Sequence, residues 1–123
     1  MNINSKTSNL ISNSQVLEIC NILRSLGLTS GLTGTRILNK AIQIISIKDL
    51  EIIVLEDIYK ELSLYFPNLK PANMRFYISY ALNNRNSCKA ENNFEKIFGF
   101  EYDEIYFEPK NFIEEVSRII QLK

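Results

Sequence analysis

The sequence contains no histidine and no tryptophan, and its 123 residues include only two cysteines, three prolines and four glycines. Because histidine is the commonest general base and metal ligand of proteins, its absence predicts a chain that is not an enzyme and that binds no metal or cofactor. The cysteines, Cys20 and Cys88, lie outside any metal-ligand spacing, so we expect both thiols to lie in the core. A hydrophobic content of 46% with so little proline and glycine excludes a disordered or fibrous chain.

Long apolar runs are also missing, since none approaches the roughly 20 residues that span a bilayer. Residues 1–13 are rich in Asn and Ser and lack the apolar stretch of a signal peptide, which predicts a mobile tail. We therefore expect a cytoplasmic protein without a membrane partner. The length is that of one domain, which residues 14–123 are expected to form.

Apolar residues recur at three- and four-residue spacing along most of the chain, which is the pattern of amphipathic helices. Helices are predicted at about 14–26, 35–46, 55–66, 71–84, 92–98 and 112–122, with Asn13 or Ser14 capping the first and Asn111 the last. The segment 49–54 fits a helix or a strand and is interpreted as helix. Residues 83–93 are predicted to be a polar connector, and 100–109 an irregular loop packed by its aromatic residues. The result is an all-α single domain of five to six helices.

Residues 55–84 are the part around which we expect the chain to be organised. The first half has an apolar stripe at helical spacing: Leu55, Ile58, Tyr59, Leu62 and Phe66. The second half has another: Met74, Ile78, Ala81 and Leu82. Pro67 prevents the first helix from continuing, and Pro71 suits the first turn of a second one, which leaves a break of about four residues. This is a helix-turn-helix pattern, which occurs in DNA-binding proteins and also in plain structural corners.

Charge is unevenly distributed, although the net charge is zero. Residues 66–89 contain four cations and no Asp or Glu, whereas eight acidic residues follow residue 89. Such segregation can steer a polyanion toward the basic segment. Four of the later acidic residues are interpreted as a solvated charged face and not as a metal or acid/base site: Glu101, Asp103, Glu104 and Glu108.

The connection GLTSGLTGTR, residues 27–36, holds three glycines and three threonines. It is not a phosphate-binding P-loop, because that motif requires a Gly-Lys-Ser/Thr string after a strand, and neither is present. Thr33, Thr35 and Arg36 are nevertheless expected to donate to a DNA phosphate, since they lie at the start of the next helix.

Five strings of this sequence resemble, in order, the C-terminal DNA-binding effector domain of the stage-zero sporulation response regulator A family. They are GLTSGLTGTRILNKAI (27–42), IYKELSLYFPN (58–68), MRFYISYAL (74–82), FEKIFGFE (94–101) and EPKNFIEEVSRIIQL (108–122). The resemblance covers nearly everything after residue 14. It implies a six-helix domain that inserts one helix into the major groove of double-stranded DNA and can pair as a homodimer on tandem sites. That family carries an N-terminal receiver domain, and this sequence is expected to act without one.

The outward positions of the second helix supply the predicted site. Five residues are expected to face the DNA bases: Asn73, Arg75, Phe76, Ser79 and Tyr80. Five are expected to contact phosphates: Thr35, Arg36, Lys70, Arg85 and Lys89. The family has arginines and a histidine on this helix, so its target sequence is not transferred to this chain. The two outward aromatics also support a second hypothesis, a protein-interaction module that pairs with a full-length regulator or with RNA polymerase.

Overall fold

The structure is a computed structural model that describes residues 11–48 and 54–122. Within these residues it contains six α-helices, one 3₁₀ helix and no strand, which confirms the predicted all-α class. The elements are α2 (Asn13–Ser25), α3 (Thr33–Ser46), α4 (Leu55–Leu62), α5 (Pro71–Asn83), α6 (Ser87–Phe98), the 3₁₀ helix η1 (Glu104–Phe107) and α7 (Pro109–Leu122). None of these described helices is long and apolar enough to cross a membrane. Most of the predicted tail, and residues 49–53 of the predicted 49–54 helix, lie outside the described residues.

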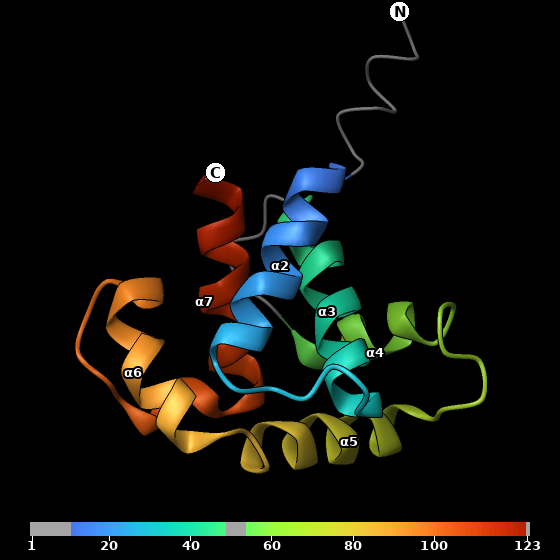
Figure 1. Cartoon of the computed structure of the whole chain (residues 1–123). Helices are drawn as coiled ribbons and strands as arrows, with labels where there is room; N and C mark the ends of the chain where they lie inside the picture. Colours follow the sequence, from blue (N-terminus) through green and yellow to red (C-terminus); the bar gives the residue numbers. More distant parts are fainter. Residues whose placement is uncertain (1–10, 49–53, 123) are drawn as a thin grey trace, which may run out of the picture.

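Helix α3 is the centre of the domain. Helices α2, α3 and α7 run alongside one another, and α5 crosses beneath them (Figure 1). α3 contacts α2, α4, α5 and α7, and it buries one broad side of its surface. Its buried apolar residues are Ile37, Leu38, Ala41, Ile42, Ile44 and Ile45. The polar residues Arg36, Asn39, Lys40 and Gln43 are not buried, so α3 is amphipathic, but it packs against four other helices. The domain is therefore organised around α3, and not around residues 55–84 as the sequence suggested.

The connection between α4 and α5 is longer than predicted. α4 ends at Leu62, and residues 63–70 separate it from α5. Its last turn tightens, because the amide of Tyr65 donates to the carbonyl of Leu62 at 2.9 Å. The hydroxyl of Ser63 also donates back to the carbonyl of Tyr59 at 3.0 Å, a bond that bends helices. The two helices do contact each other, but the tight turn of about four residues was wrong.

Residues 83–93 are not a single connector. α6 begins at Ser87, because the side chain of Asn86 accepts from the amide of Lys89 at 3.0 Å and caps the helix. Lys89 and Cys88 therefore lie in the first turn of α6. Cys88 is exposed and Cys20 is half-buried, so the prediction of two core thiols was wrong for Cys88.

Two other helix starts differ from the prediction by a few residues. Ser12 caps α2, and it exchanges hydrogen bonds with Gln15 in a capping box. α7 begins at Pro109, and the side chain of Asn111 donates instead to the carbonyl of Ile105 at 3.1 Å. Proline suits the first position of a helix because its missing amide hydrogen is not needed there.

The aromatic residues of 100–109 pack as predicted, although part of the segment is a 3₁₀ helix. The ring of Phe94, fully buried, is the centre of the cluster. Its ring centroid lies 5.0 Å from that of Tyr102 and 5.9 Å from that of Phe107. The side chain of Asp103 accepts from the amide of Ile105 at 3.1 Å and so starts η1.

Candidate nucleic-acid interface

The inner side of α5 is anchored in the core. Four side chains at helical spacing have no solvent exposure: Met74, Ile78, Ala81 and Leu82. Each of the three larger side chains contributes about 1.5–3 kcal/mol through burial, which fixes the rotation of α5 about its axis. The predicted inner face is confirmed, and the opposite face is fixed as a consequence.

The outer side of α5 carries the predicted base-facing residues. Asn73, Arg75, Phe76 and Tyr80 are exposed, and Ser79 is half-buried. The exposed fraction is 65% for Phe76 and 50% for Tyr80, and their spacing of four residues places the two rings next to each other on one helix face. The structure thus brings all five residues to one side of a single helix.

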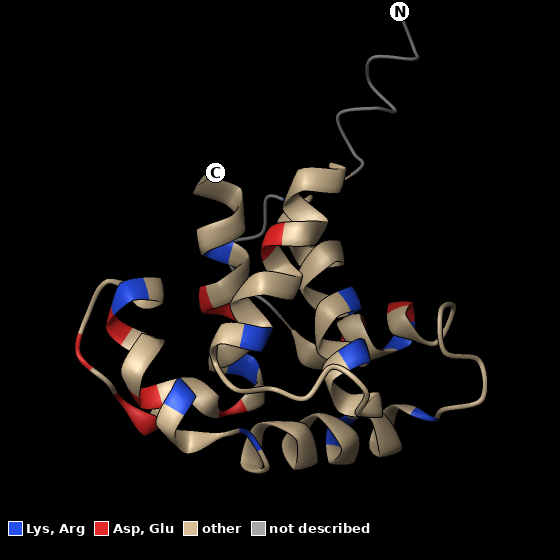
Figure 2. Cartoon of the chain, in the orientation of Figure 1, with Lys and Arg blue, Asp and Glu red and all other residues tan. Residues whose placement is uncertain are grey.

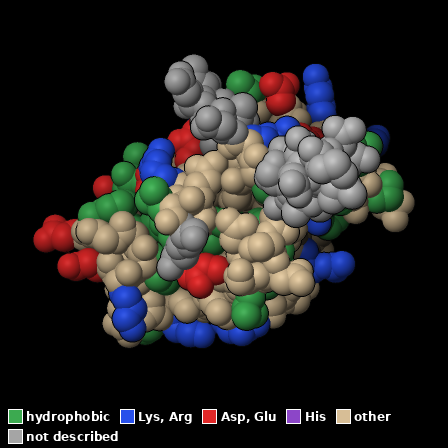
Figure 3. Space-filling model, turned by 90° about the horizontal axis from the view of Figure 1, so that it is seen from above, with side chains coloured by type: hydrophobic (Ala, Val, Ile, Leu, Met, Phe, Trp, Pro, Cys, Tyr) green, Lys and Arg blue, Asp and Glu red, His purple; other side chains and the backbone are tan. Residues whose placement is uncertain are grey.

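Basic residues precede and follow α5 in the chain. Lys70 is exposed directly before α5, and Lys89 is exposed in the first turn of α6. Arg36, near the start of α3, is exposed but lines a hollow between α2 and α3. Figure 2 shows no acidic position on α5, whose one charged residue is Arg75, whereas acidic positions gather on α6, η1 and the neighbouring loop. The end of the molecule opposite α5 shows side chains of both signs, with acidic ones concentrated at its left edge (Figure 3).

Arg85 does not belong to this basic surface. Its side chain is only 8% exposed, and it forms an ion pair with Glu104 at 2.7 Å. The guanidinium also donates to the hydroxyl of Tyr102 at 3.0 Å and to the carbonyl of Leu82 at 2.8 Å, and it stacks 3.7 Å from the ring centroid of Phe107. Its hydrogen-bonding capacity is directed inward, so we remove Arg85 from the predicted phosphate contacts.

Thr35 is also unsuited to a phosphate contact. α3 begins at Thr33, two residues earlier than predicted, which places Thr35 within its first turn. Thr35 is 5% exposed, and its hydroxyl is buried with no hydrogen-bond partner in the described part of the chain. The hydroxyl does not reach the outer surface, where a DNA backbone would lie.

Arg75 lies close to α4, which the sequence did not indicate. Burial raises the pKa of the Tyr59 hydroxyl above its ordinary range, and the nearby charge of Arg75 partly offsets that rise. Glu56 acts in the opposite direction to Arg75 on the same hydroxyl. α4 and α5 contact each other, and the charge of Arg75 on α5 acts on this hydroxyl of α4.

A shallow apolar hollow adjoins the outer aromatics. It has a volume of about 200 Å³ and is lined by the start of α3, from Leu32 to Gly34, and by Phe76, Tyr77 and Tyr80. The ring of Phe76 meets that of Tyr77 edge-on, with centroids 5.7 Å apart. The exposed face of α5 therefore combines one charged residue with an apolar patch.

The acidic residues after α6 behave as the solvated face that was predicted. Glu101, Asp103, Glu104 and Glu108 are all exposed. Among the described residues there is no group of three His, Cys, Asp or Glu side chains that could hold a metal ion.

Two cations near the start of α3 were missed by the sequence analysis. Arg24 of α2 and Lys40 of α3 lie on the same side of the domain as Arg36, where they line a second hollow. Lys40 follows Arg36 by four residues, a spacing that places both on one helix face. Arg24 lies on another helix, and sequence spacing cannot relate positions on different helices.

Comparison with family models, curated protein sequences and solved structures finds no match to this chain.

Proposed function

We propose that the chain is a transcriptional regulator that binds double-stranded DNA with α5 in the major groove. The observation that carries this proposal is the division of α5 into a fully buried side and an exposed side with Arg75 and no acidic residue. The resemblance to the sporulation regulator effector domain, noted from the sequence, agrees with it. On that basis a homodimer on tandem sites is also proposed.

The exposed groups suit the chemistry of the major groove, which is about 12 Å wide and admits a helix. Arginine forms paired hydrogen bonds to guanine and asparagine to adenine, which are roles for Arg75 and Asn73. Phe76 and Tyr80 are suited to contact with thymine methyl groups. Lys70 and Lys89 are left to bind phosphates, which fix register without reading sequence, whereas Arg36 lines the hollow on another side of the domain.

A second function is favoured by the exposed aromatics. Phe76 and Tyr80 next to an apolar hollow are features of protein-binding surfaces, where buried aromatic residues carry most of the affinity. In this proposal the domain binds a full-length regulator or RNA polymerase, and the two rings are its anchors.

The deciding experiment selects bound oligonucleotides from a random pool with the purified chain at two salt concentrations. DNA binding predicts an enriched sequence and an affinity that falls steeply with salt, because each neutralised phosphate adds about 0.9 to the log–log slope. Arg75→Ala should then abolish selection, while Lys96→Ala, which removes an exposed cation from the end of α6, should not. An absence of enrichment with a flat salt response rejects the proposal. Loss of a protein complex on Phe76→Ala with unchanged DNA affinity supports the second function.

A further inference from the structure

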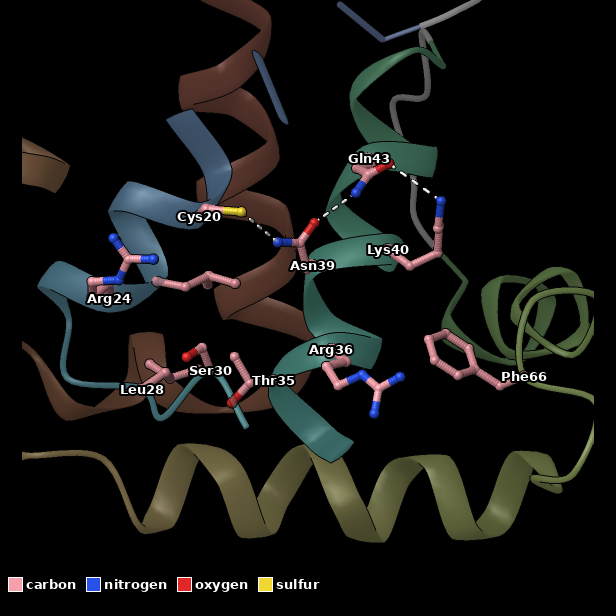
Figure 4. A pocket seen from close by; sticks show the side chains of 11 residues that line it. Cys20, Arg24, Leu28, Ser30, Thr35, Arg36, Asn39, Lys40, Gln43 and Phe66 are labelled. Carbon is pink, nitrogen blue, oxygen red and sulfur yellow. Dashed lines mark hydrogen bonds between the residues drawn. The ribbon is translucent and has the colours of Figure 1, made fainter. Parts of the chain in front are cut away.

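A hollow of about 340 Å³ lies between α2, α3 and the segment that precedes α5. Its walls come from α2 and α3, and Phe66 closes it on the side of the 63–70 segment (Figure 4). α5 passes below it in that view, so the hollow opens on a different side of the domain from the outer face of α5. Ligand pockets in proteins hold about 300–1,000 Å³, and about 150 Å³ is enough for benzene. The hollow is large enough for a small ring with a substituent.

Three cations line this hollow, and no acidic side chain does: Arg24, Arg36 and Lys40. Four ion pairs form among the described residues, and none of them includes these three. The Lys40 ammonium donates to the side-chain oxygen of Gln43 at 3.4 Å and lies 4.6 Å from the ring centroid of Tyr65, and neither partner carries a negative charge. Positive charges that gather without a counter-charge attract an anion.

The other residues that line the hollow are suited to the uncharged part of a ligand. Leu23, Leu28 and Phe66 supply apolar surface. The polar side chains along the α2–α3 wall already bond to one another. Asn39 donates to the sulfur of Cys20 at 3.2 Å, and Gln43 donates to the oxygen of Asn39 at 2.6 Å, as Figure 4 shows. These two amides are engaged with each other and with Cys20, whereas the cations and the Thr35 hydroxyl, which has no hydrogen-bond partner within the described residues, remain as donors in the lining.

We propose that this hollow binds a small organic anion. Its phosphate or carboxylate group is attracted by the positive charges of Arg24, Arg36 and Lys40, which lie at separate points around the hollow (Figure 4), and its apolar part lies against Leu23, Leu28 and Phe66. Guanidinium groups bind both kinds of anion through paired hydrogen bonds, which gives geometric selectivity as well as charge. The proposal does not rest on DNA binding, because the hollow is built from α2, α3 and Phe66.

The test is an NMR titration of the isotope-labelled full chain with three probes that share one ring: phenyl phosphate, phenylacetate and benzyl alcohol. We expect saturable shifts of amides in α2, in α3 and near Phe66 with at least one of the two anions. Benzyl alcohol should bind at least about tenfold more weakly, because it lacks the charge. The anion with the lower Kd identifies the head group.

Matched variants locate the binding. Arg24→Gln and Lys40→Gln should each raise the Kd for the preferred anion by about three- to tenfold. Lys96→Gln removes the same charge from the end of α6 and should leave the Kd unchanged. Thermal melting of each variant shows that the fold is kept. The proposal is overturned if neither anion shifts these amides saturably, if benzyl alcohol binds as tightly, or if Lys96→Gln weakens binding as much as Arg24→Gln.

Discussion

Gly34 lies directly against the backbone of Tyr77. A Cβ atom placed on Gly34 would be 1.9 Å from the carbonyl oxygen of Tyr77 and 2.8 Å from the Cβ atom of Ala81. The start of α3 therefore rests on the backbone of α5 with no room for a side chain. Tyr77 is next to the outward residue Phe76 and to the buried residue Ile78 in the chain. The contact with Gly34 therefore fixes the distance between α3 and α5.

Gly34→Ala should strongly destabilise the domain. The added methyl group meets a carbonyl of a helix that is itself packed, so neither side can yield without moving α3 away from α5. Overpacking of this kind costs about 1–3 kcal/mol and occasionally more. Denaturant unfolding measures the loss, and Gly31→Ala is the control, since nothing lies within 4 Å of a Cβ at that position. Equal stabilities of the two variants would contradict the packing of α3 on α5.

Gly27 and Gly99 form a second matched pair, because both have a positive φ, of 87° and 86°. A side chain in this region costs roughly 1–2 kcal/mol at either position. Gly27 has a further constraint, since an added Cβ would lie 2.4 Å from the carbonyl oxygen of Asn86, whereas the space around Gly99 is open. Gly27→Ala should therefore be clearly more destabilising than Gly99→Ala in chemical denaturation. If the two variants lost the same free energy of unfolding, the contact between Gly27 and the backbone of Asn86 would not be tight.

Periodicity identified the inner face of α5 because a helix buries residues at a fixed spacing, and Met74, Ile78, Ala81 and Leu82 follow that spacing. The same rule identified the buried side of α3, but periodicity tells which side of a helix is buried and not how many helices pack against it, so the central position of α3 was missed. Arg85 was misassigned for a different reason. Charge counting over residues 66–89 omits Glu104, which approaches Arg85 only because the chain folds back through η1.

The end points of helices depended on local bonds that composition does not reveal. Asn86 begins α6 by capping it, although its neighbours are the polar residues of an expected loop. Ser63 helps to end α4 four residues before Pro67. The outward face was predictable from the inner one, whereas the hollow lined by Arg24, Arg36 and Lys40 was not, because it joins two helices and the segment at Phe66.

Arg85→Ala should destabilise the domain. It should not remove a phosphate contact, so DNA binding by the folded variant should not weaken for that reason. The substitution removes a nearly buried side chain that bonds to Leu82 and Tyr102 and stacks on Phe107. Hydrogen bonds from charged donors contribute about 1.5–3 kcal/mol, and lost packing adds to this. Thermal melting should show the loss, while the salt dependence of DNA affinity should keep its slope. A reduced slope in a folded variant would restore Arg85 to the phosphate contacts.

The same cluster predicts an acid-dependent stability. The hydrogen bond from the Tyr102 hydroxyl, and then that from Arg85, lower the pKa of Glu104. A carboxyl whose pKa is lower in the folded state stabilises the protein above its unfolded pKa, and this contribution is lost as the pH falls through the folded pKa. Glu104→Gln should therefore reduce stability at neutral pH and should lose less on acidification than the wild type. Glu101→Gln, at an exposed position nearby, is the control.

Lys70 and Lys89 should each contribute one phosphate contact. Both are exposed at the ends of the outer face of α5, and no ion pair engages either of them within the described residues. Replacing either by alanine should weaken binding to all DNA sequences alike and lower the log–log salt slope by about one. Fluorescence anisotropy with a selected and an unrelated duplex measures both effects, and Lys96→Ala is the charge-matched control. Because phosphates position a helix without reading bases, a change in sequence preference on Lys70→Ala would show that this lysine reads a base edge instead.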